Sequence, residues 1–438
     1  MNILSVCFSG SLAVLACTVA FKAHAADPIQ RWYSADGTLI YLAERHELPI
    51  LDIAVQFKGT GGSENLETAA VASSVASMLT SGTAALDEEA VYDRANELAA
   101  ELDSSGTIGA SRITMRIVSN NDRFDEAVQL MNDMIVRPRF DADVLKRRQE
   151  QAVTALKQAQ SQPGYRGTQA LSLLNYPNHP YGWEAKKSEA LIRSVNPAKM
   201  QGYYRDHYGR DNAAVLIVGD ADRSRAEQIA AAVLAGLPAK SRTQTGIPEV
   251  PLHRGQYQNV PFADTQQAIV MLGLPLVQRK DPDYVALAVG NYILGGGSFD
   301  SRLMKILRDQ HGYTYGASSS FSPAQQKGPF GISFSTEKAR AAEALEVTKK
   351  LLADFIAEGP TEAELQQAKD HITGSFPMYF DTNAKMAARL ADMAMYDLPT
   401  DYFANYPAKV AALTTAQIKE AWQRRLNADD MNIVVVGQ

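Results

Sequence analysis

The chain has 438 residues, more than one ordinary hydrophobic core accommodates and enough for two domains of common size. Hydrophobic residues make up 46% of it and charged residues 21%, so a large core can form. The net charge of −6 argues against nucleic acid as the main partner, because phosphate binding requires a basic surface.

Residues 1–25 have the features of an export signal. An apolar run, Val6–Phe21, is followed by Ala23-His24-Ala25, which fits the A-x-A pattern of signal-peptide cleavage. No Lys or Arg precedes the run, a departure from the usual signal, but the run is too short for a comfortable membrane span. We therefore expect a signal peptide over residues 1–25 and an exported, periplasmic protein without a membrane span.

Both cysteines lie inside this leader. Cys17 follows Leu15-Ala16, which loosely resembles a lipoprotein site, although apolar residues continue past Cys17. Cys7 is the other cysteine, so the mature chain has none and cannot form disulfides. Its stability must come from a large core.

An internal repeat organises the rest of the chain. Residues 198–219 and 416–437 align without a gap, with Tyr204 opposite Trp422. Each segment has an amphipathic helical pattern, a polar turn and a buried β-branched strand that ends in glycine.

A second pair of segments lies upstream in the same order. Residues 141–145 and 362–366 follow Pro138 and Pro360, and each opens a helix with acidic residues in its first turn, where the helix dipole favours them. Two matches in one order indicate duplicated halves.

The boundary between the halves is marked by prolines. Residues 237–262 carry Pro238, Pro248, Pro251 and Pro261, and we expect an extended linker there. The fold class is therefore α+β. We expect two homologous domains, 26–236 and 263–438, each a mostly antiparallel sheet with helices packed on one face.

A glycine-rich run, Gly295, Gly296 and Gly297, follows the apolar helical pattern Tyr284–Leu294. Consecutive glycines let the backbone approach another chain closely, and they also suit a simple flexible turn between helices. A phosphate-binding loop is excluded by the spacing and by the lack of a preceding strand.

Residues 299–309 are expected to form a helix that Gly312 ends, and residues 313–321 alternate like a strand. The apolar face of this helix would carry Phe299, Leu303, Ile306 and Leu307, and its solvent-exposed basic face Arg302, Lys305 and Arg308.

The run GGGSFDSRLMKILRDQHGYTYGASSS, which begins at Gly295, resembles the second-half signature of the pitrilysin/insulysin and mitochondrial processing peptidase family, a family of inverted zinc peptidases. The segment Asn178–Gly182 is similar to the family's H-P-Y-G segment. The resemblance covers nearly the whole mature chain. It implies that the two domains form one half of a clamshell, and that Arg308 and Tyr315 match the family's substrate-gripping Arg and Tyr.

The chemistry of this pair is consistent with that role. A peptidase must hold the peptide backbone and stabilise the charge that develops on the scissile carbonyl oxygen. A guanidinium such as that of Arg308 and a phenol such as that of Tyr315 are suitable donors. The resemblance places Gly295, Gly296 and Gly297 beside them in the substrate-binding segment.

The family's zinc motif, however, is missing. Catalytic members carry H-x-x-E-H on a helix of the first half, plus a distal glutamate. The matching stretch here places Ser73 and Ser77 at the two histidine positions and Ala76 at the base. The distal glutamate falls at or beside Thr154, with Glu150 one turn earlier. Hydroxyl and methyl groups are not zinc ligands, so we expect no metal in this chain.

Other histidines do not replace the motif. None of those in the mature chain has another at i+3 or i+4: His46, His179, His207, His253, His311 and His371. A lone histidine is more often structural than a ligand.

In the two-subunit members of the family, one chain supplies zinc and the other supplies the Gly-rich loop and the Arg/Tyr pair. The resemblance therefore implies a heterodimer in which a homologous H-x-x-E-H partner binds zinc and this chain, inactive alone, contributes Arg308 and Tyr315 to peptide hydrolysis. The peptide would add as a strand to a sheet edge.

Three alternatives stay open. The chain is a non-enzymatic scaffold of the same fold, a protein that clamps peptides without cleaving them, or an independent hydrolase. Against the last, no G-x-S-x-G elbow is present and Ser318–Ser320 has the pattern of a polar strand.

Overall fold

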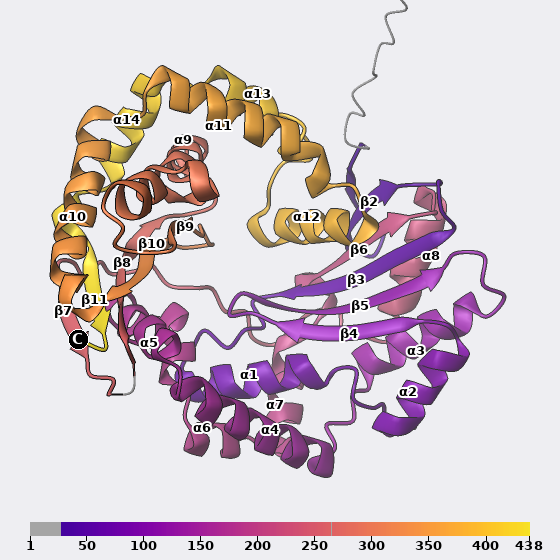
Figure 1. Ribbon diagram of the computed structural model, residues 1–438. Helices are drawn as coiled ribbons and strands as arrows, with labels where there is room; N and C mark the ends of the chain where they lie inside the picture. Colours follow the sequence, from indigo (N-terminus) through magenta and orange to yellow (C-terminus); the bar gives the residue numbers. More distant parts are fainter. Residues whose placement is uncertain (1–27, 264) are drawn as a thin grey trace, which may run out of the picture.

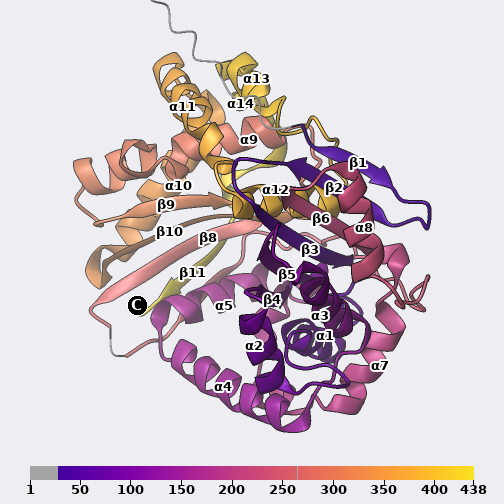
Figure 2. The same ribbon diagram turned by 90° about the vertical axis from the view of Figure 1, so that its right-hand side faces the viewer.

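The computed structural model describes residues 28–263 and 265–438. The expected signal peptide, residues 1–25, with Cys7 and Cys17, lies outside the described residues. The chain forms two α+β halves, each built on one sheet (Figures 1 and 2).

The first half holds a six-stranded sheet in the order β1-β2-β6-β3-β5-β4. Its strands are β1 (Gln30–Tyr33), β2 (Leu39–Glu44), β3 (Ile50–Lys58), β4 (Glu101–Gly106), β5 (Ala110–Val118) and β6 (Ala213–Gly219). Its helices are α1 (Leu66–Met78), α2 (Glu88–Glu97), α3 (Phe124–Val136), α4 (Ala142–Gln160), α5 (Pro163–Asn175), α6 (Glu189–Arg193), α7 (Pro197–His207) and α8 (Arg223–Val233).

The second half holds a five-stranded sheet in the order β7-β11-β8-β10-β9. Its strands are β7 (Tyr257–Val260), β8 (Gln267–Val277), β9 (Ala317–Phe321), β10 (Gly328–Glu337) and β11 (Asn432–Val436). Its helices are α9 (Tyr284–Asn291), α10 (Ala341–Glu358), α11 (Glu362–Ser375), α12 (Asn383–Tyr396), α13 (Tyr406–Ala412) and α14 (Thr415–Arg425).

The two sheets have the same topology apart from the additional edge strand β1 of the first sheet. In the first sheet, the last strand β6 lies between β2, to which it is parallel, and β3, to which it is antiparallel. In the second sheet, the last strand β11 lies in the same way between β7, to which it is parallel, and β8, to which it is antiparallel. The other pairings between the named strands are antiparallel. The duplicated α+β fold expected from the sequence is confirmed. The last residues of the proline-rich stretch form β7 rather than a free linker.

The repeat holds down to the direction of single side chains. Ile217 in β6 and Val435 in β11 face the main helical layer of their own half. Their neighbours Leu216 and Val434 face the opposite side of the sheet. Strands buried on both faces need two apolar surfaces, which explains the continuous β-branched runs in these strands.

Each opposite face is covered by one helix of the other half. Helix α12 packs its Met386 and Leu390 on Tyr41 and Leu216 of the first sheet. Helix α5 packs on strands β8 and β11 of the second sheet. Figure 1 shows α12 against β3 and β6, and α5 beside β8 and β11. Helices therefore cover both faces of each sheet, whereas the sequence predicted one.

Polar contacts accompany these crossings. Gln56 in β3 donates from Nε2 to the carbonyl of Ala391 in α12 at 3.1 Å. Asn432 in β11 donates from Nδ2 to Oδ1 of Asn175 in α5 at 2.9 Å. Each satisfies a buried amide that would otherwise be costly.

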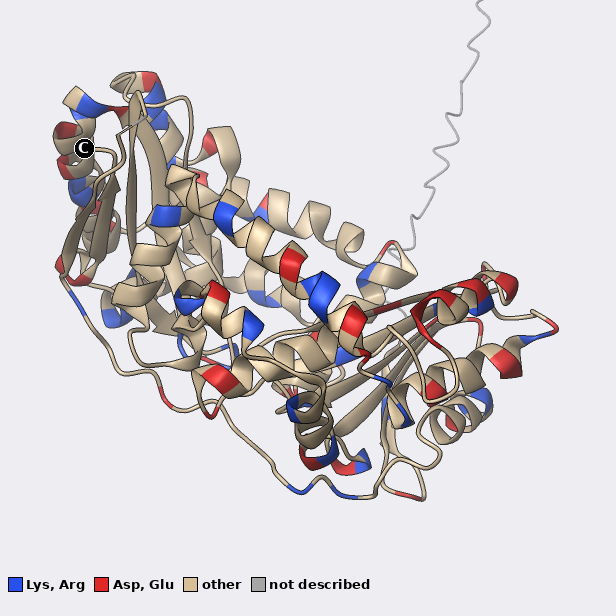
Figure 3. Ribbon diagram, turned by 90° about the horizontal axis from the view of Figure 1, so that it is seen from below, with Lys and Arg blue, Asp and Glu red and all other residues tan. Residues whose placement is uncertain are grey.

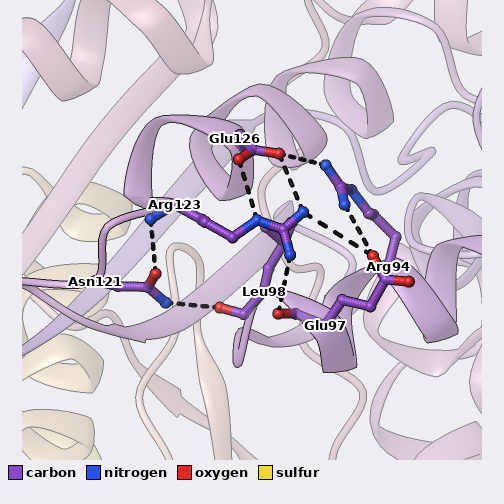
Figure 4. Close-up of polar contacts among 6 residues, drawn as sticks. All are labelled: Arg94, Glu97, Leu98, Asn121, Arg123 and Glu126. Atoms are coloured by element: carbon purple, nitrogen blue, oxygen red, sulfur yellow. Dashed lines mark hydrogen bonds and ion pairs between the residues drawn. The ribbon is translucent and has the colours of Figure 1, made fainter.

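Charged surface groups join neighbouring elements of the first half. Figure 4 shows Glu126 of α3 between Arg94 of α2 and Arg123, and Asn121 donating to the carbonyl of Leu98 at 2.8 Å. Exposed ion pairs of this kind contribute little stability. Basic and acidic residues occur in both halves (Figure 3), so charge does not separate the halves.

Arg302 is the exception to the expected exposed basic face. Its Nε and Nη2 each donate to a carboxylate oxygen of Glu364 at 2.7 Å, and its Nη2 also donates to the carbonyl of Gly359 at 3.0 Å. The guanidinium stacks over the ring of Phe355 at 5.0 Å. Arg302 thus fixes the segment after the Gly-rich run to the turn between α10 and α11.

Glu364 also caps α11, where it accepts hydrogen bonds from the backbone and hydroxyl of Thr361. Partial burial opposes ionisation, but the hydrogen bonds from Arg302 and Thr361 lower the pKa of Glu364 to about 2. Ionised Glu364 therefore stabilises the folded state above the unfolded pKa of 4.5, and this contribution is lost as the pH falls towards 2.

Replacing Leu390 with Ala tests the covering of the first sheet. Leu390 of α12 is fully buried against the first sheet, so Leu390→Ala should lower the free energy of unfolding by about 2–5 kcal/mol in urea denaturation. Leu48, which is 62% exposed, provides the matched control, and Leu48→Ala should leave stability unchanged. Equal effects of the two substitutions would contradict the packing role of α12.

Replacing Glu364 with Gln keeps an acceptor for the cap and removes the ion pair. Glu364→Gln should lower the free energy of unfolding by about 1–3 kcal/mol at pH 7. The difference from wild type should shrink as the pH falls from 4.5 towards 2, because wild-type Glu364 then becomes protonated. Glu346→Gln, at an exposed pair with Lys349, is the control and should change neither quantity.

Candidate functional site

The Gly-rich run continues α9 as one π-helical turn, Tyr292–Gly296. Gly295 is buried, and a Cβ there would lie 2.5 Å from the backbone nitrogen of Ser319 in β9. Gly296 is exposed and Gly297 is half-buried against the ring of Tyr292. The close approach that requires glycine at position 295 is therefore made by the chain's own strand, and Gly296 is the glycine that faces solvent.

Phe299 does not join the apolar helical face predicted for it. Leu303 and Leu307 are buried and Ile306 is half-buried, but Phe299 is 64% exposed. Ser298 has a positive φ of 55° and opens a separate short turn, so the regular helical face begins only after it. An exposed aromatic ring therefore stands beside the Gly-rich run.

Arg308 lies over that ring. Its guanidinium carbon is 5.1 Å from the centroid of Phe299, and its Nη1 is 3.8 Å from the carboxylate of Asp309. The Arg308 side chain is 42% exposed. Stacking on Phe299 holds the guanidinium while leaving its donors accessible.

Tyr315 projects from a tight turn. The expected strand begins at Ala317 rather than at residue 313, because Gly312 has a positive φ of 59° and the Thr314 hydroxyl donates to the carbonyl of Gly316. The ring of Tyr315 is 91% exposed. Such an aromatic side chain adds nothing to the core and is available to a ligand.

Arg308, Tyr315 and Phe299 thus come from one segment, which runs from the Gly-rich run to β9 and is fixed by Arg302. The segment offers a guanidinium, a phenol hydroxyl and an apolar ring to solvent. Guanidinium and phenol donors can hold a peptide carbonyl oxygen or a negative charge that develops on it.

The positions that match the zinc motif meet in one cavity. Ser73, Ala76 and Ser77 of α1 line a cavity of about 410 Å³ together with Arg148 and Gln149 of α4. These three positions of α1 therefore share one face of the helix, and their match to the zinc motif stays a prediction.

The guanidinium of Arg148, beside this cavity, is held by hydrogen bonds to other groups of the chain. It donates to the carbonyl of Ser77 at 2.9 Å, to the hydroxyl of Ser81 at 2.7 Å and to Glu88 at 3.3 Å. Gln149 donates to the carbonyls of Ile192 and Val195. The polar groups on this side of the cavity are thus satisfied internally.

Thr154 and Glu150 lie away from this cavity. The Thr154 hydroxyl is exposed and donates to the carbonyl of Glu150 at 2.9 Å. The Glu150 carboxylate accepts from both Nη atoms of Arg193, at 2.7 and 3.1 Å, and these hydrogen bonds lower its pKa. Neither residue lines the cavity.

This donor set does not fit zinc. Two hydroxyls, a methyl group and a guanidinium do not provide the nitrogen, sulfur or carboxylate ligands that Zn²⁺ requires, and a cation repels it. Within residues 28–263 and 265–438, no group of three His, Cys, Asp or Glu side chains is arranged to hold a metal ion.

The H-P-Y-G segment has a structural role that the sequence did not reveal. Nδ1 of buried His179 accepts from the backbone of Tyr181, so Nε2 carries the proton and donates to the carbonyl of Pro248 at 2.9 Å. Burial lowers the pKa of His179. The Tyr181 hydroxyl accepts from the backbone of Gln326, at the turn between β9 and β10. The segment therefore ties the two halves together.

A second cavity, of about 250 Å³, was also missed. It lies beside Gly296, and its lining includes Arg279, Asn291, Arg389 and Tyr402. The only sequence signal was a concentration of aromatic residues at 376–380 and 402–406, which no periodic pattern connects to the Gly-rich run.

Comparisons with known proteins agree with this geometry. Residues 194–372 match the family model described as the peptidase M16 inactive domain. A crystal structure of a peptidase M16 inactive domain from Pseudomonas fluorescens has a TM-score of 0.87 and 31% identity, over 93% of this chain and 97% of that chain.

Two further relatives extend the comparison. The non-peptidase homolog YmxG of Helicobacter pylori is 22% identical over 397 residues, which is 90% of this chain and 90% of that protein. The periplasmic protease PqqL of Escherichia coli shares the fold, with a TM-score of 0.81 at 16% identity, and the match spans 100% of this chain but 49% of that one.

The resemblance inferred from the Gly-rich signature is confirmed. The chain belongs to the M16, or pitrilysin-like, peptidase family, as a member whose relatives include an inactive domain and a non-peptidase homologue.

Proposed function

We propose that this chain is the metal-free subunit of a two-subunit zinc peptidase. One observation carries the proposal. Arg308 and Tyr315 are exposed on a segment held by buried contacts, whereas the positions of the zinc motif contain Ser73, Ala76 and Ser77. The groups that grip a substrate are kept and those that bind the metal are gone.

The length of a related protease supports a two-unit assembly. This chain matches 49% of PqqL, which is titled a periplasmic protease, so that protease has about the length of two such units. In the proposed complex, the second unit is a separate homologous chain that carries H-x-x-E-H, zinc and the general base.

The role of this chain is then to bind and orient the peptide. Arg308 and Tyr315 would donate to the carbonyl oxygen that becomes negative beside the partner's metal. The exposed glycine of the Gly-rich run, Gly296, would let the peptide backbone pass closely. The peptide would lie extended and add to a sheet edge, since β4 and β9 are end strands of their sheets.

Export completes the proposal. The leader at residues 1–25 would direct the chain to the periplasm, where a protein without disulfides relies on its core. No helix in the described part of the chain is long and apolar enough to cross a membrane. The domain boundaries proposed for the mature chain are 26–236, a linker at 237–262, and 263–438.

Mixing experiments test the shared site. Peptide hydrolysis should require both this chain and its H-x-x-E-H homologue, and Arg308→Ala or Tyr315→Phe should lower kcat/KM of the mixture by roughly 10²–10³-fold, the usual cost of losing one oxyanion donor. The exposed residues Arg205 and Tyr92, both in the first half, give matched controls, so Arg205→Ala and Tyr92→Phe should leave the rate unchanged.

Each contrary result points elsewhere. Hydrolysis by this chain alone would identify an independent enzyme. If the mixture is no faster than the homologue alone, the chain is either a non-enzymatic scaffold or a peptide-binding protein. The cavity of about 250 Å³ favours the peptide-binding protein.

Zinc analysis tests the metal assignment separately. After incubation with zinc and dialysis, this chain should retain essentially no zinc, because Ser73 and Ser77 cannot replace histidine ligands. The H-x-x-E-H homologue, treated in parallel, should retain about one zinc per chain. Stoichiometric zinc in this chain, measured by plasma mass spectrometry, would overturn the metal-free assignment.

A further inference from the structure

The cavity beside Gly296 has an unusual lining for its size of about 250 Å³. It is enclosed by α9, the end of α11 with the turn that follows it, α12 and the start of α13. Eight of its residues are aromatic: Tyr284, Tyr292, Phe376, Tyr379, Phe380, Tyr402, Phe403 and Tyr406. Two are arginines, Arg279 and Arg389, and Asn291 adds an amide.

Four polar atoms in this lining are buried and have no hydrogen-bond partner. They are Nε of Arg279, Nε of Arg389, the hydroxyl of Tyr402 and Oδ1 of Asn291. An unsatisfied buried polar group costs about 1–3 kcal/mol, so four around one cavity mark a place where a ligand or water would supply the missing partners. No residue that lines the 410 Å³ cavity has such an atom among the described residues.

The cavity also carries excess positive charge. Arg279 has no ion pair within residues 28–263 and 265–438, and the carboxylate that acts on it, Asp392, is ion-paired with Arg389 at 3.3 Å. The guanidinium of Arg279 lies over the rings of Tyr284 at 4.4 Å and Tyr402 at 5.5 Å. Stacking compensates part of its desolvation but does not supply a counter-ion.

The hydroxyl of Tyr402 remains a hydrogen-bond donor. Burial raises the pKa of Tyr402 to about 12, so its hydroxyl stays protonated at neutral pH. Burial also raises the pKa of Asp392, the carboxylate that pairs with Arg389. A protonated phenol beside an arginine without an ion pair in the described part of the chain favours an anionic ligand.

The polar side chains of the lining match one chemical group. Arg279, Arg389 and Tyr402 carry donors, which suit a carboxylate, and the amide of Asn291 carries an acceptor, which suits an amide N–H. A carboxylate next to an amide N–H is the last residue of a peptide. The volume admits about one residue, and the aromatic walls favour an apolar or aromatic side chain.

We propose that this cavity binds the C-terminal residue of a peptide, through its carboxylate and its backbone N–H, with an apolar or aromatic terminal side chain. A free N-acylated amino acid has the same chemistry. Gly296 lines the cavity, so the rest of a bound peptide would leave past the Gly-rich run. The site belongs to this chain alone and does not depend on a zinc-binding partner.

Calorimetric titration of the full chain with small ligands tests the proposal directly. N-acetylphenylalanine should bind, and its amide, which lacks the carboxylate, should bind at least about tenfold more weakly because the charge-assisted hydrogen bonds are lost. 3-Phenylpropanoate, which lacks the N–H, should bind with intermediate affinity. Equal affinity for the acid and its amide would overturn the proposal without any variant.

Variants then assign the contacts. Arg279→Gln should weaken binding of N-acetylphenylalanine by at least about tenfold, and Arg279→Lys, which keeps the charge, should lose less. Asn291→Leu should abolish the preference for N-acetylphenylalanine over 3-phenylpropanoate. Arg205→Gln, at an exposed arginine of the first half, is the matched control outside the cavity and should bind N-acetylphenylalanine normally. Thermal unfolding of each variant separates lost binding from lost folding.

A pentapeptide ending in phenylalanine separates the two ligand sources. It should bind at least as tightly as N-acetylphenylalanine, and its C-terminal amide should not. Binding of the free amino acid derivative without binding of the pentapeptide would overturn the assignment to a peptide terminus.

Discussion

The exchange of one helix between the halves is the constraint on which the rest of this structure depends. Each sheet is apolar on both faces, and its own half supplies helices for only one of them. Helix α12 covers the second face of the first sheet and α5 that of the second. Neither half could bury both faces of its sheet alone, since its own helices cover only one of them. The uncovered apolar face would favour aggregation. These two contacts, together with the segment Asn178–Gly182, therefore hold the two halves against each other.

The zinc-motif positions of α1 and the segment that carries Arg308 and Tyr315 differ in how their polar groups are used. At the zinc-motif positions of α1, Arg148 and the neighbouring serines satisfy one another, which removes both the ligands and the need for them. On the Gly-rich side, Arg302 and Glu364 hold the backbone firmly, while Arg308 and Tyr315 are left exposed at its surface. Rigid support beneath exposed donors is the arrangement expected where binding geometry matters.

The sequence predicted what depends on local pattern. The aligned runs that contain Ile217 and Val435 specify equivalent strands with the same face buried, because side chains alternate strictly along a strand. Ser73, Ala76 and Ser77 were placed together correctly because helical spacing puts them on one face.

What the sequence could not predict depends on distant partners. Arg302 has the same helical spacing as Lys305 and Arg308, and only the position of Glu364 makes it buried and paired. The amphipathic pattern of α12 indicates an apolar face but does not say which sheet it covers. The exposure of Phe299 follows from a left-handed Ser298, a conformation rare for a residue other than glycine. The domain limits are still proposals, and the leader lies outside the described residues.

The two cavities occupy equivalent places in the duplicated halves. The 410 Å³ cavity is lined by α1, α4 and α6, and the 250 Å³ cavity lies between α9, α11 and α13, the helices at corresponding places in the second half. In the first, the buried polar atoms have partners within the chain; in the second, four do not. Folding tolerates unpaired buried groups only where other interactions offset their cost, and binding sites are where that cost serves a purpose. A chain kept only as a scaffold would have no reason to retain this cost. The arginine, tyrosine and asparagine atoms without partners are therefore consistent with the peptide-binding role proposed above.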